Sequence, residues 1–256
     1  MLQNRVLDLE PRMNFQHHPN LPSSFRMLII GSSASGKTCL LLNFLLETGF
    51  MDYNNLIIFT PTKSQQEYQL LYHGYSNGLS KESIVAILLN QEQFKGVPIP
   101  TLCRRYAELH KQSGGITCRL TDRTDDLIPP DKLDRSKKNL IIFDDCVTTA
   151  NQNILSSYFI KGRHNSCNCI YLSQSYFDLD KKIRLNANIL VLFKLSQKNK
   201  TDVFNSVIGN IIDKKGFDAL TSNVWSKKHR YIVVNRESEK IFDDIFKEAE
   251  SDSESE

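Results

Sequence analysis

Short apolar runs alternate along the chain with segments that have helical spacing. Six runs are apolar at nearly every position, as in strands buried on both faces: 27–31, 55–60, 139–144, 169–174, 188–195 and 230–235. Segments with a helical pattern lie between them: 39–46, 63–75, 80–94 with Ser80 as its cap, 148–161 and 200–212. This alternation predicts an α/β fold, in which helices cover both faces of a mainly parallel sheet.

Three further segments lack this pattern. Residues 1–25 are polar and contain three prolines, which indicates an N-terminal arm. Residues 95–138 carry ten bases against six acids and look irregular, so we expect a basic insertion at the edge of the sheet. A single core domain would then span 26–235. For residues 236–256 we expect a C-terminal helix followed by a disordered acidic tail.

The charge of the chain is unevenly distributed. Lys and Arg number 32 and Asp and Glu 29, but residues 243–256 hold seven of the acids and one base. The remainder therefore carries +9, which favours a polyanionic partner. No apolar run approaches the roughly 18 residues that span a membrane, and the N-terminus lacks the apolar region of a secretory signal. Six cysteines are too sparse for a disulfide scaffold in a chain of this length and indicate free thiols in a reducing, intracellular compartment.

The strongest motif is GSSASGKT, residues 31–38, which matches G-x-x-x-x-G-K-[ST] between an apolar strand and a helix. In this motif the glycines let backbone N–H groups point inward around phosphates, and the helix dipole adds to the attraction. Lys37 would reach the β- and γ-phosphates of ATP, and Thr38 would offer its hydroxyl to Mg²⁺. The predicted nucleotide-binding residues are Gly31, Ser32, Ser33, Ala34, Ser35, Gly36, Lys37 and Thr38.

A second acidic motif follows the third apolar run. NLIIFDD, residues 139–145, has the form of a Walker B strand. Asp144 would hold Mg²⁺, largely through water, and Asp145 would orient the attacking water. The alternative for Asp145 is a cap on the next helix.

Two more residues fit a hydrolysis site. Gln174 stands at the tip of the fourth apolar run, where its amide would contact the γ-phosphate or the attacking water; Ser173 is its competitor, and a merely exposed amide is the other alternative. Arg163 lies in the loop IKGRHNS before that run, which we expect at the nucleotide edge of the sheet. An arginine on such a loop can act as a finger on the nucleotide of a neighbouring subunit. The alternative is an ordinary surface arginine.

The order of GSSASGKT, LIIFDD, the GRHNS loop and YLSQ resembles the FtsK–HerA superfamily of P-loop ATPases. It is most similar to the genome-packaging ATPases of poxvirus-like large DNA viruses, virophages and polinton-type elements. The stretch IRLNANILVLFK, residues 183–194, also resembles the family's entry into its last core strand. One departure concerns water activation, because many members of the superfamily place Glu where this chain has Asp145.

The resemblance implies a P-loop core of the additional-strand type, with the strand that ends in Gln174 between the P-loop and Walker B strands. It also implies a hexameric ring of identical subunits around double-stranded DNA, gripped at its backbone without sequence specificity, and docking on viral capsid proteins. Arg163, with Arg184 as competitor, would be the finger acting across the subunit boundary. The expected location is the host cytoplasm or virus factory, with association to the virion as a further option.

The sequence therefore favours an ATP-hydrolysing, Mg²⁺-dependent DNA translocase that packages a viral genome. A small-molecule P-loop kinase and a nucleotide-dependent regulatory switch remain as alternatives. GTP is disfavoured because the chain contains no N-K-x-D motif.

Overall fold

The computed structural model describes residues 13–111, 114–149, 151–243 and 245. Its centre is one eight-stranded sheet in the order β3-β2-β4-β5-β1-β6-β7-β8. The first six strands in this order are parallel; β7 pairs antiparallel with β6, and β8 pairs antiparallel with β7. The strands are β1 (Arg26–Ile30), β2 (Asn55–Phe59), β3 (Thr117–Thr121), β4 (Asn139–Asp144), β5 (Cys167–Ser173), β6 (Ile189–Phe193), β7 (Tyr231–Asn235) and β8 (Lys240–Phe242). The mainly parallel sheet is confirmed, and so is the position of β5 between the P-loop strand β1 and the acidic strand β4.

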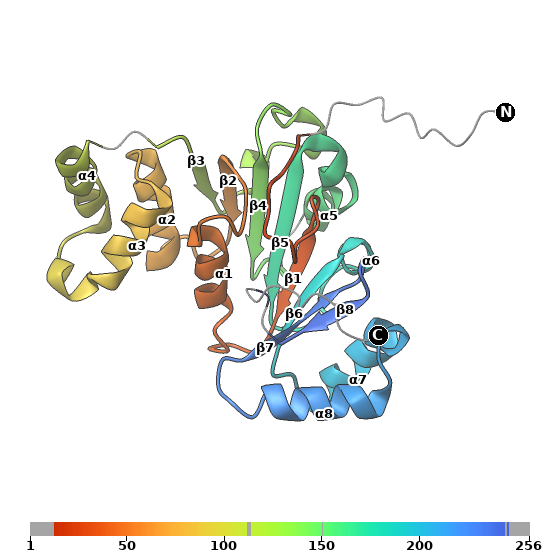
Figure 1. Ribbon diagram of the computed structural model, residues 1–256. Coiled ribbons are helices and arrows are strands. Elements are labelled where there is room, and N and C mark those ends of the chain that lie inside the picture. Colours follow the sequence, from red (N-terminus) through yellow and green to blue (C-terminus); the bar gives the residue numbers. More distant parts are fainter. Residues whose placement is uncertain (1–12, 112–113, 150, 244, 246–256) are drawn as a thin grey trace, which may run out of the picture.

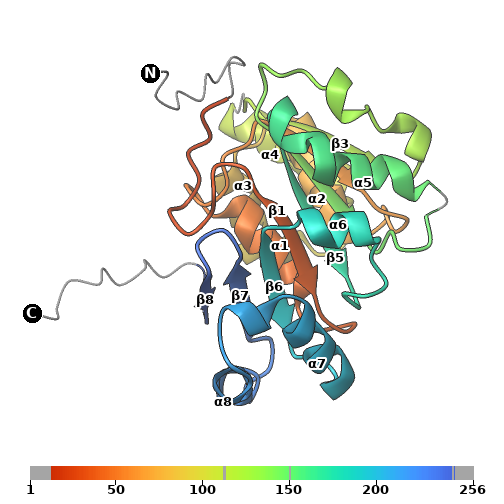
Figure 2. The ribbon, with the colours of Figure 1, turned by 90° about the vertical axis from the view of Figure 1, so that its right-hand side faces the viewer.

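Helices cover both faces of this sheet, as the apolar strands require. They are α1 (Lys37–Leu46), α2 (Gln66–Ser76), α3 (Lys81–Leu89), α4 (Ile99–His110), α5 (Gln152–Lys161), α6 (Lys181–Asn186), α7 (Gln197–Ser206) and α8 (Lys214–Val224). Met27 and Ile29 of β1 pack with α1, α2 and α3, whereas Leu28 and Ile30 pack with α5 to α8. Figure 2 shows α5 and α6 in front of the sheet, with α2, α3 and α4 behind it.

The insertion between β2 and β4 is more ordered than its composition suggested. It was expected to be irregular, but it contains α4 and the edge strand β3. Together α2, α3 and α4 form a helical unit that projects from the β3 edge of the sheet (Figure 1). Strand β3 was missed because its side chains alternate between exposed and partly buried, as suits an edge strand. Helix α4 was missed because Cys103 is its single fully buried residue.

The two ends of the chain also differ from expectation. The polar arm is partly built into the core, because Leu21 and Phe25 are buried and the His17 ring packs against Phe25. Strand β8 occupies part of the segment for which a C-terminal helix was predicted, so that prediction is wrong for residues 240–242. The prediction of a disordered tail lies almost wholly outside the described residues. Ile245 is fully buried, and its carbonyl accepts a hydrogen bond from Asn20 Nδ2 at 2.8 Å.

Candidate functional site

The loop between β1 and α1 has the curled backbone that a phosphate site needs. Gly36 has φ +104° and Ala34 has φ +60°, so the chain turns through the left-handed region twice before α1. Gly31 N–H donates to Ser173 O at 3.2 Å and fixes the loop to β5. A Cβ atom on Gly31 would lie 2.6 Å from Ser35 Oγ, which is too close for any other residue. The sequence motif is therefore a real structural loop.

The start of α1 leaves donors available to an anion. Among the described residues, no side chain caps α1 at Gly36, and its first turn carries no acid. Lys37 Nζ donates to Gly31 O at 2.7 Å and to Ser32 O at 2.9 Å, so its ammonium group lies over the loop. Ser35 Oγ is buried and has no hydrogen-bond partner in the described part of the chain. These donors fit the phosphates of a nucleotide.

The acidic pair lies at the same edge of the sheet. Asp144 is the last residue of β4 and is 8% exposed. Its Oδ2 atom accepts a hydrogen bond of 2.6 Å from the hydroxyl of Tyr68, in the first turn of α2. Burial raises the pKa of Asp144 and the charge of Asp145 adds to this, whereas the Tyr68 hydrogen bond and the Lys37 charge lower it. A cation at this position would stabilise the ionised carboxylate.

Asp145 has a different environment. It is exposed, has φ +52°, and is tied to β5 by its N–H, which donates to Leu172 O at 3.2 Å. The next helix, α5, begins seven residues later, and its cap is Asn151, which accepts from Ile154 N at 3.4 Å. The alternative role of Asp145 as a helix cap is therefore excluded. Asp145 lines the same cavity as the phosphate loop.

The tip of β5 presents Gln174 rather than Ser173. Ser173 is buried, and its hydroxyl donates to Ser175 O at 2.9 Å. Gln174 is exposed and lines the same cavity as the acids. This cavity has a volume of about 500 Å³. It brings together the predicted residues Ser33, Ala34, Ser35, Gly36, Lys37, Thr38, Asp144, Asp145 and Gln174.

The cavity contains oxygen donors of the kind that Mg²⁺ prefers, namely the Thr38 hydroxyl and the Asp144 carboxylate. In the described ranges, no group of three or more His, Cys, Asp or Glu side chains could hold a metal. An ion bound by Thr38 and Asp144 would take its remaining ligands from water and nucleotide phosphates, which is usual for Mg²⁺. All six cysteines have free thiols.

The loop with Arg163 does not lie where we predicted. It forms a 3₁₀ turn, residues Gly162–Asn165, directly before β5, so it lies at the amino ends of the parallel strands. There Arg163 lines a cavity with Arg26, the first residue of β1, at the edge opposite the phosphate loop. The predicted position at the nucleotide edge of the sheet is therefore wrong. The competing candidate Arg184 lies in α6. Its Nε atom donates a hydrogen bond to Leu179 O at 3.1 Å, and its guanidinium group lies over the rings of Tyr176 and Phe177.

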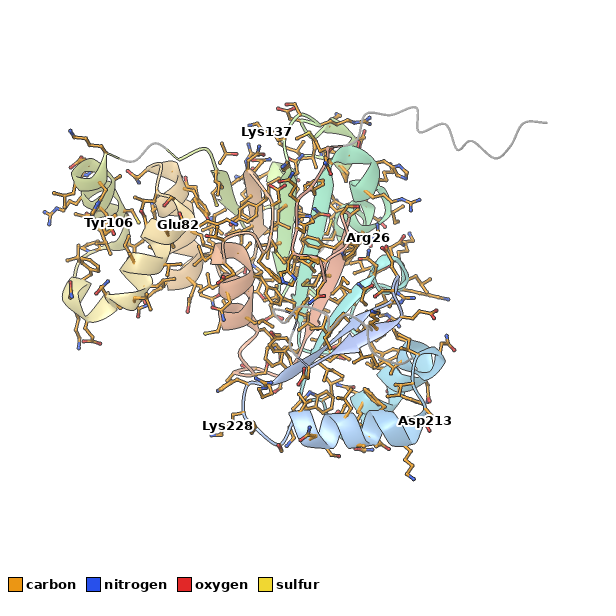
Figure 3. The ribbon with its side chains drawn as sticks, in the orientation of Figure 1. Arg26, Glu82, Tyr106, Lys137, Asp213 and Lys228 are labelled. Atoms are coloured by element: carbon orange, nitrogen blue, oxygen red, sulfur yellow. The ribbon has the colours of Figure 1, made fainter. Side chains whose placement is uncertain are left out.

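Sequence reasoning also missed neighbours of the phosphate loop. The segment 227–230 reads KKHR and lies at the carboxyl edge, where His229 Nδ1 is 3.0 Å from Ser35 O. Lys228 in this segment and Lys137, just before β4, lie at opposite ends of the sheet (Figure 3). Glu67 and Gln65, from the start of α2, line the cavity as well. The basic run KKHR is visible in the sequence, but nothing there indicates that it reaches the P-loop.

Comparison with known proteins agrees with this geometry. Residues 12–95 match the family described as Poxvirus A32 protein. The resemblance to poxvirus-like packaging ATPases is confirmed. The matched third of the chain includes the P-loop, β2 and the first two helices of the helical unit. No curated protein matches the chain.

Solved structures show the fold. The genome-packaging NTPase B204 of Sulfolobus turreted icosahedral virus 2, in complex with ATP-gammaS, is similar with a TM-score of 0.52 and 10% identity over 87% of this chain and 97% of that one. Its complex with AMP has a TM-score of 0.51, also at 10% identity over 87% of this chain and 97% of that one. B204 of Sulfolobus turreted icosahedral virus, described as a DNA-packaging ATPase, has a TM-score of 0.50 and 12% identity over 84% of this chain and 94% of that one. The predicted P-loop NTPase fold is confirmed. No helix within the described residues is both long and apolar enough to cross a membrane.

Proposed function

We propose that this chain is an ATP-driven motor that moves double-stranded DNA into a viral capsid. The observation that carries the proposal is the single cavity in which the P-loop, Asp144, Asp145 and Gln174 meet, on a fold shared with viral packaging NTPases. The P-loop amides and Lys37 would bind the phosphates of ATP. Thr38 and Asp144 would hold Mg²⁺, which supplies a charge that bridges the β- and γ-phosphates.

The remaining polar groups are suited to hydrolysis. Asp145 is exposed at the carboxyl edge and would orient the attacking water. Gln174, at the end of the neighbouring strand β5, would contact the water or the γ-phosphate. Positioning and charge stabilisation of this kind account for most of the catalysis in phosphoryl transfer.

The DNA contacts would come from exposed lysine and arginine side chains, which lie on two separate surfaces of the subunit. Arg104, Arg105 and Lys111 belong to α4 and its end, on the α1 side of the sheet. Lys181 and Lys182 belong to α6, on the opposite side. A single DNA duplex in a ring would therefore meet one of these two groups from any one subunit. Contacts of this type bind phosphates without reading the bases.

DNA should stimulate ATP turnover if the chain is a motor. We expect linear double-stranded DNA to raise the steady-state ATPase rate several-fold at low salt, and the stimulation to fade as salt rises because phosphate contacts release counterions. Phosphate release measured with and without DNA tests this, and electron microscopy with ATP and DNA reports whether a hexameric ring forms. A small-molecule kinase would consume ATP only when its phosphate-accepting substrate is present, and a regulatory switch would bind ATP without steady hydrolysis. An ATPase rate that does not change with DNA would therefore contradict the motor hypothesis.

Arg163 would act across a subunit boundary. A head-to-tail ring joins two different faces of the subunit, so the amino edge with Arg163 can face the carboxyl edge of its neighbour. Arg163→Ala should then bind ATP normally and lose about 10³-fold in turnover. Lys161→Ala removes an exposed base two residues away and serves as the control.

Mixing separates a finger from a structural arginine. Arg163→Ala and Lys37→Ala subunits should each be inactive alone, whereas a mixed ring contains interfaces with one intact P-loop and one intact arginine. Partial ATPase activity on mixing supports the finger. If mixed oligomers form without activity, Arg163 has no role in trans, and Arg184 becomes the candidate.

A further inference from the structure

A buried hydrogen bond joins the helical unit to the acidic strand. The hydroxyl of Tyr68 donates to Asp144 Oδ2 at 2.6 Å, and the two residues are 76 positions apart in the sequence. Tyr68 is fully buried, and Asp144 is almost so. A short hydrogen bond from a hydroxyl to a carboxylate is among the stronger ones in proteins.

The topology explains why these two side chains meet. Strands β2 and β4 are parallel neighbours in register, with Phe59 beside Phe143, so both end at the same edge of the sheet. The chain leaves β2 at that edge, makes a turn through residues 60–65 and enters α2. The first turn of α2 therefore lies beside the end of β4. Thr62, Gln65 and Glu67 from this segment line the nucleotide cavity, while Tyr68 is buried next to Asp144.

The bond restricts what Asp144 can do. The carboxylate of Asp144, at the end of β4, could rotate about its side-chain bonds, whereas a metal ligand must keep a fixed orientation. The Tyr68 hydroxyl occupies Oδ2 and leaves Oδ1 for a metal ion or a metal-bound water. Partners that orient metal ligands in this way typically account for 10–100-fold in metal affinity or activity.

Tyr68 belongs to α2, the first helix of the helical unit between β2 and β3. Helix α2 packs against α4 and β3, the outer parts of the insertion. The Tyr68 hydrogen bond thus joins the helical unit to the end of β4 that carries Asp144. A movement of α2 relative to the sheet would change the hydrogen bond directly.

We propose that Tyr68 is a positioning residue that orients Asp144 for Mg²⁺ and so links the helical unit to ATP hydrolysis. The inference rests on the proposed nucleotide site, but not on DNA translocation. The catalytic contacts remain those of Asp144 and its neighbours, because Tyr68 acts through the carboxylate.

Tyr68→Phe tests this, because Phe fills the same space without the hydroxyl. Mn²⁺ serves as the probe: electron paramagnetic resonance with the non-hydrolysable analogue AMPPCP reports Mn²⁺ affinity without turnover. We expect Tyr68→Phe to weaken Mn²⁺ binding by about 10-fold. Binding of the metal-free nucleotide should change by less than about twofold.

Tyr75→Phe is a matched control in the same helix. Tyr75 is also buried, and its hydroxyl is 2.9 Å from the hydroxyl of Tyr53, away from the acids. It should lose thermal stability as Tyr68→Phe does, but keep wild-type Mn²⁺ affinity. Equal Mn²⁺ affinity in wild type, Tyr68→Phe and Tyr75→Phe would overturn the proposal.

A double-mutant cycle distinguishes orientation from a general loss of structure. In an Asp144→Asn background, Tyr68→Phe should alter Mn²⁺ affinity by less than about twofold, because the ligand it orients is already changed. The same loss in both backgrounds contradicts a role through Asp144. These outcomes are independent of DNA stimulation, so the motor hypothesis can fail while this proposal stands.

Discussion

Lys37→Ala should abolish ATP binding at ordinary nucleotide concentrations and with it all turnover. The Lys37 ammonium group lies over the phosphate loop, where it donates to the carbonyl groups of Gly31 and Ser32. A bound nucleotide would give Lys37 charged phosphate oxygens as hydrogen-bond acceptors in place of these neutral carbonyl groups. One charge-assisted hydrogen bond contributes about 1.5–3 kcal/mol, or roughly 10–100-fold in affinity. Loss of the compensating charge for the γ-phosphate adds to this.

Isothermal titration with ATP and a phosphate-release assay measure both effects. Lys215→Ala, which removes an exposed lysine of α8 that does not line the nucleotide cavity, is the control and should behave as wild type. The fold should be unaffected in both variants, because neither side chain is part of the two apolar clusters. Unchanged hydrolysis in Lys37→Ala would falsify the P-loop assignment.

Asp145→Asn should separate binding from chemistry. Asn tolerates the left-handed backbone at φ +52° as Asp does, so the substitution removes charge without straining the chain. Asp145 caps no helix. We therefore expect near-normal Mg²⁺–ATP affinity and stability, with kcat lower by at least about 10² because the attacking water loses its acceptor.

Asn151→Ala is the matched control for this prediction. It removes the residue that does cap α5 and should cost about 0.5–2 kcal/mol of stability without changing kcat. Thermal unfolding and steady-state turnover, measured on both variants, give opposite patterns if the assignment is right. Normal hydrolysis by Asp145→Asn would remove Asp145 from the mechanism.

The sequence predicted the elements whose apolar character is strong. The six runs that were apolar throughout are β1, β2, β4, β5, β6 and β7. The P-loop and the acids could be brought together from sequence because each follows a buried parallel strand, and such strands end at one edge. The elements missed were β3, β8 and three helices, α4, α6 and α8. The two missed strands lie at the edges of the sheet; β3 has one fully buried residue and β8 has none.

Two features of the site needed the structure. Arg163 was placed at the wrong edge, although a segment directly before a parallel strand lies at the amino end of that strand. The link between Tyr68 and Asp144 left no trace in the pattern, because a tyrosine on the apolar face of a helix looks like any core residue. Pairing of positions so distant in sequence depends on the complete path of the chain.

The helical unit is inserted in the sequence between β2 and β3, two strands that pair directly as hydrogen-bonded neighbours. An insertion of this kind can grow, shrink or be replaced in the course of evolution while the sheet keeps its register, since loop closure costs little extra for added length. The constraint would fall on the first turn of α2, which touches the acids. We therefore expect homologues to differ more in α3 and α4 than in the first turn of α2.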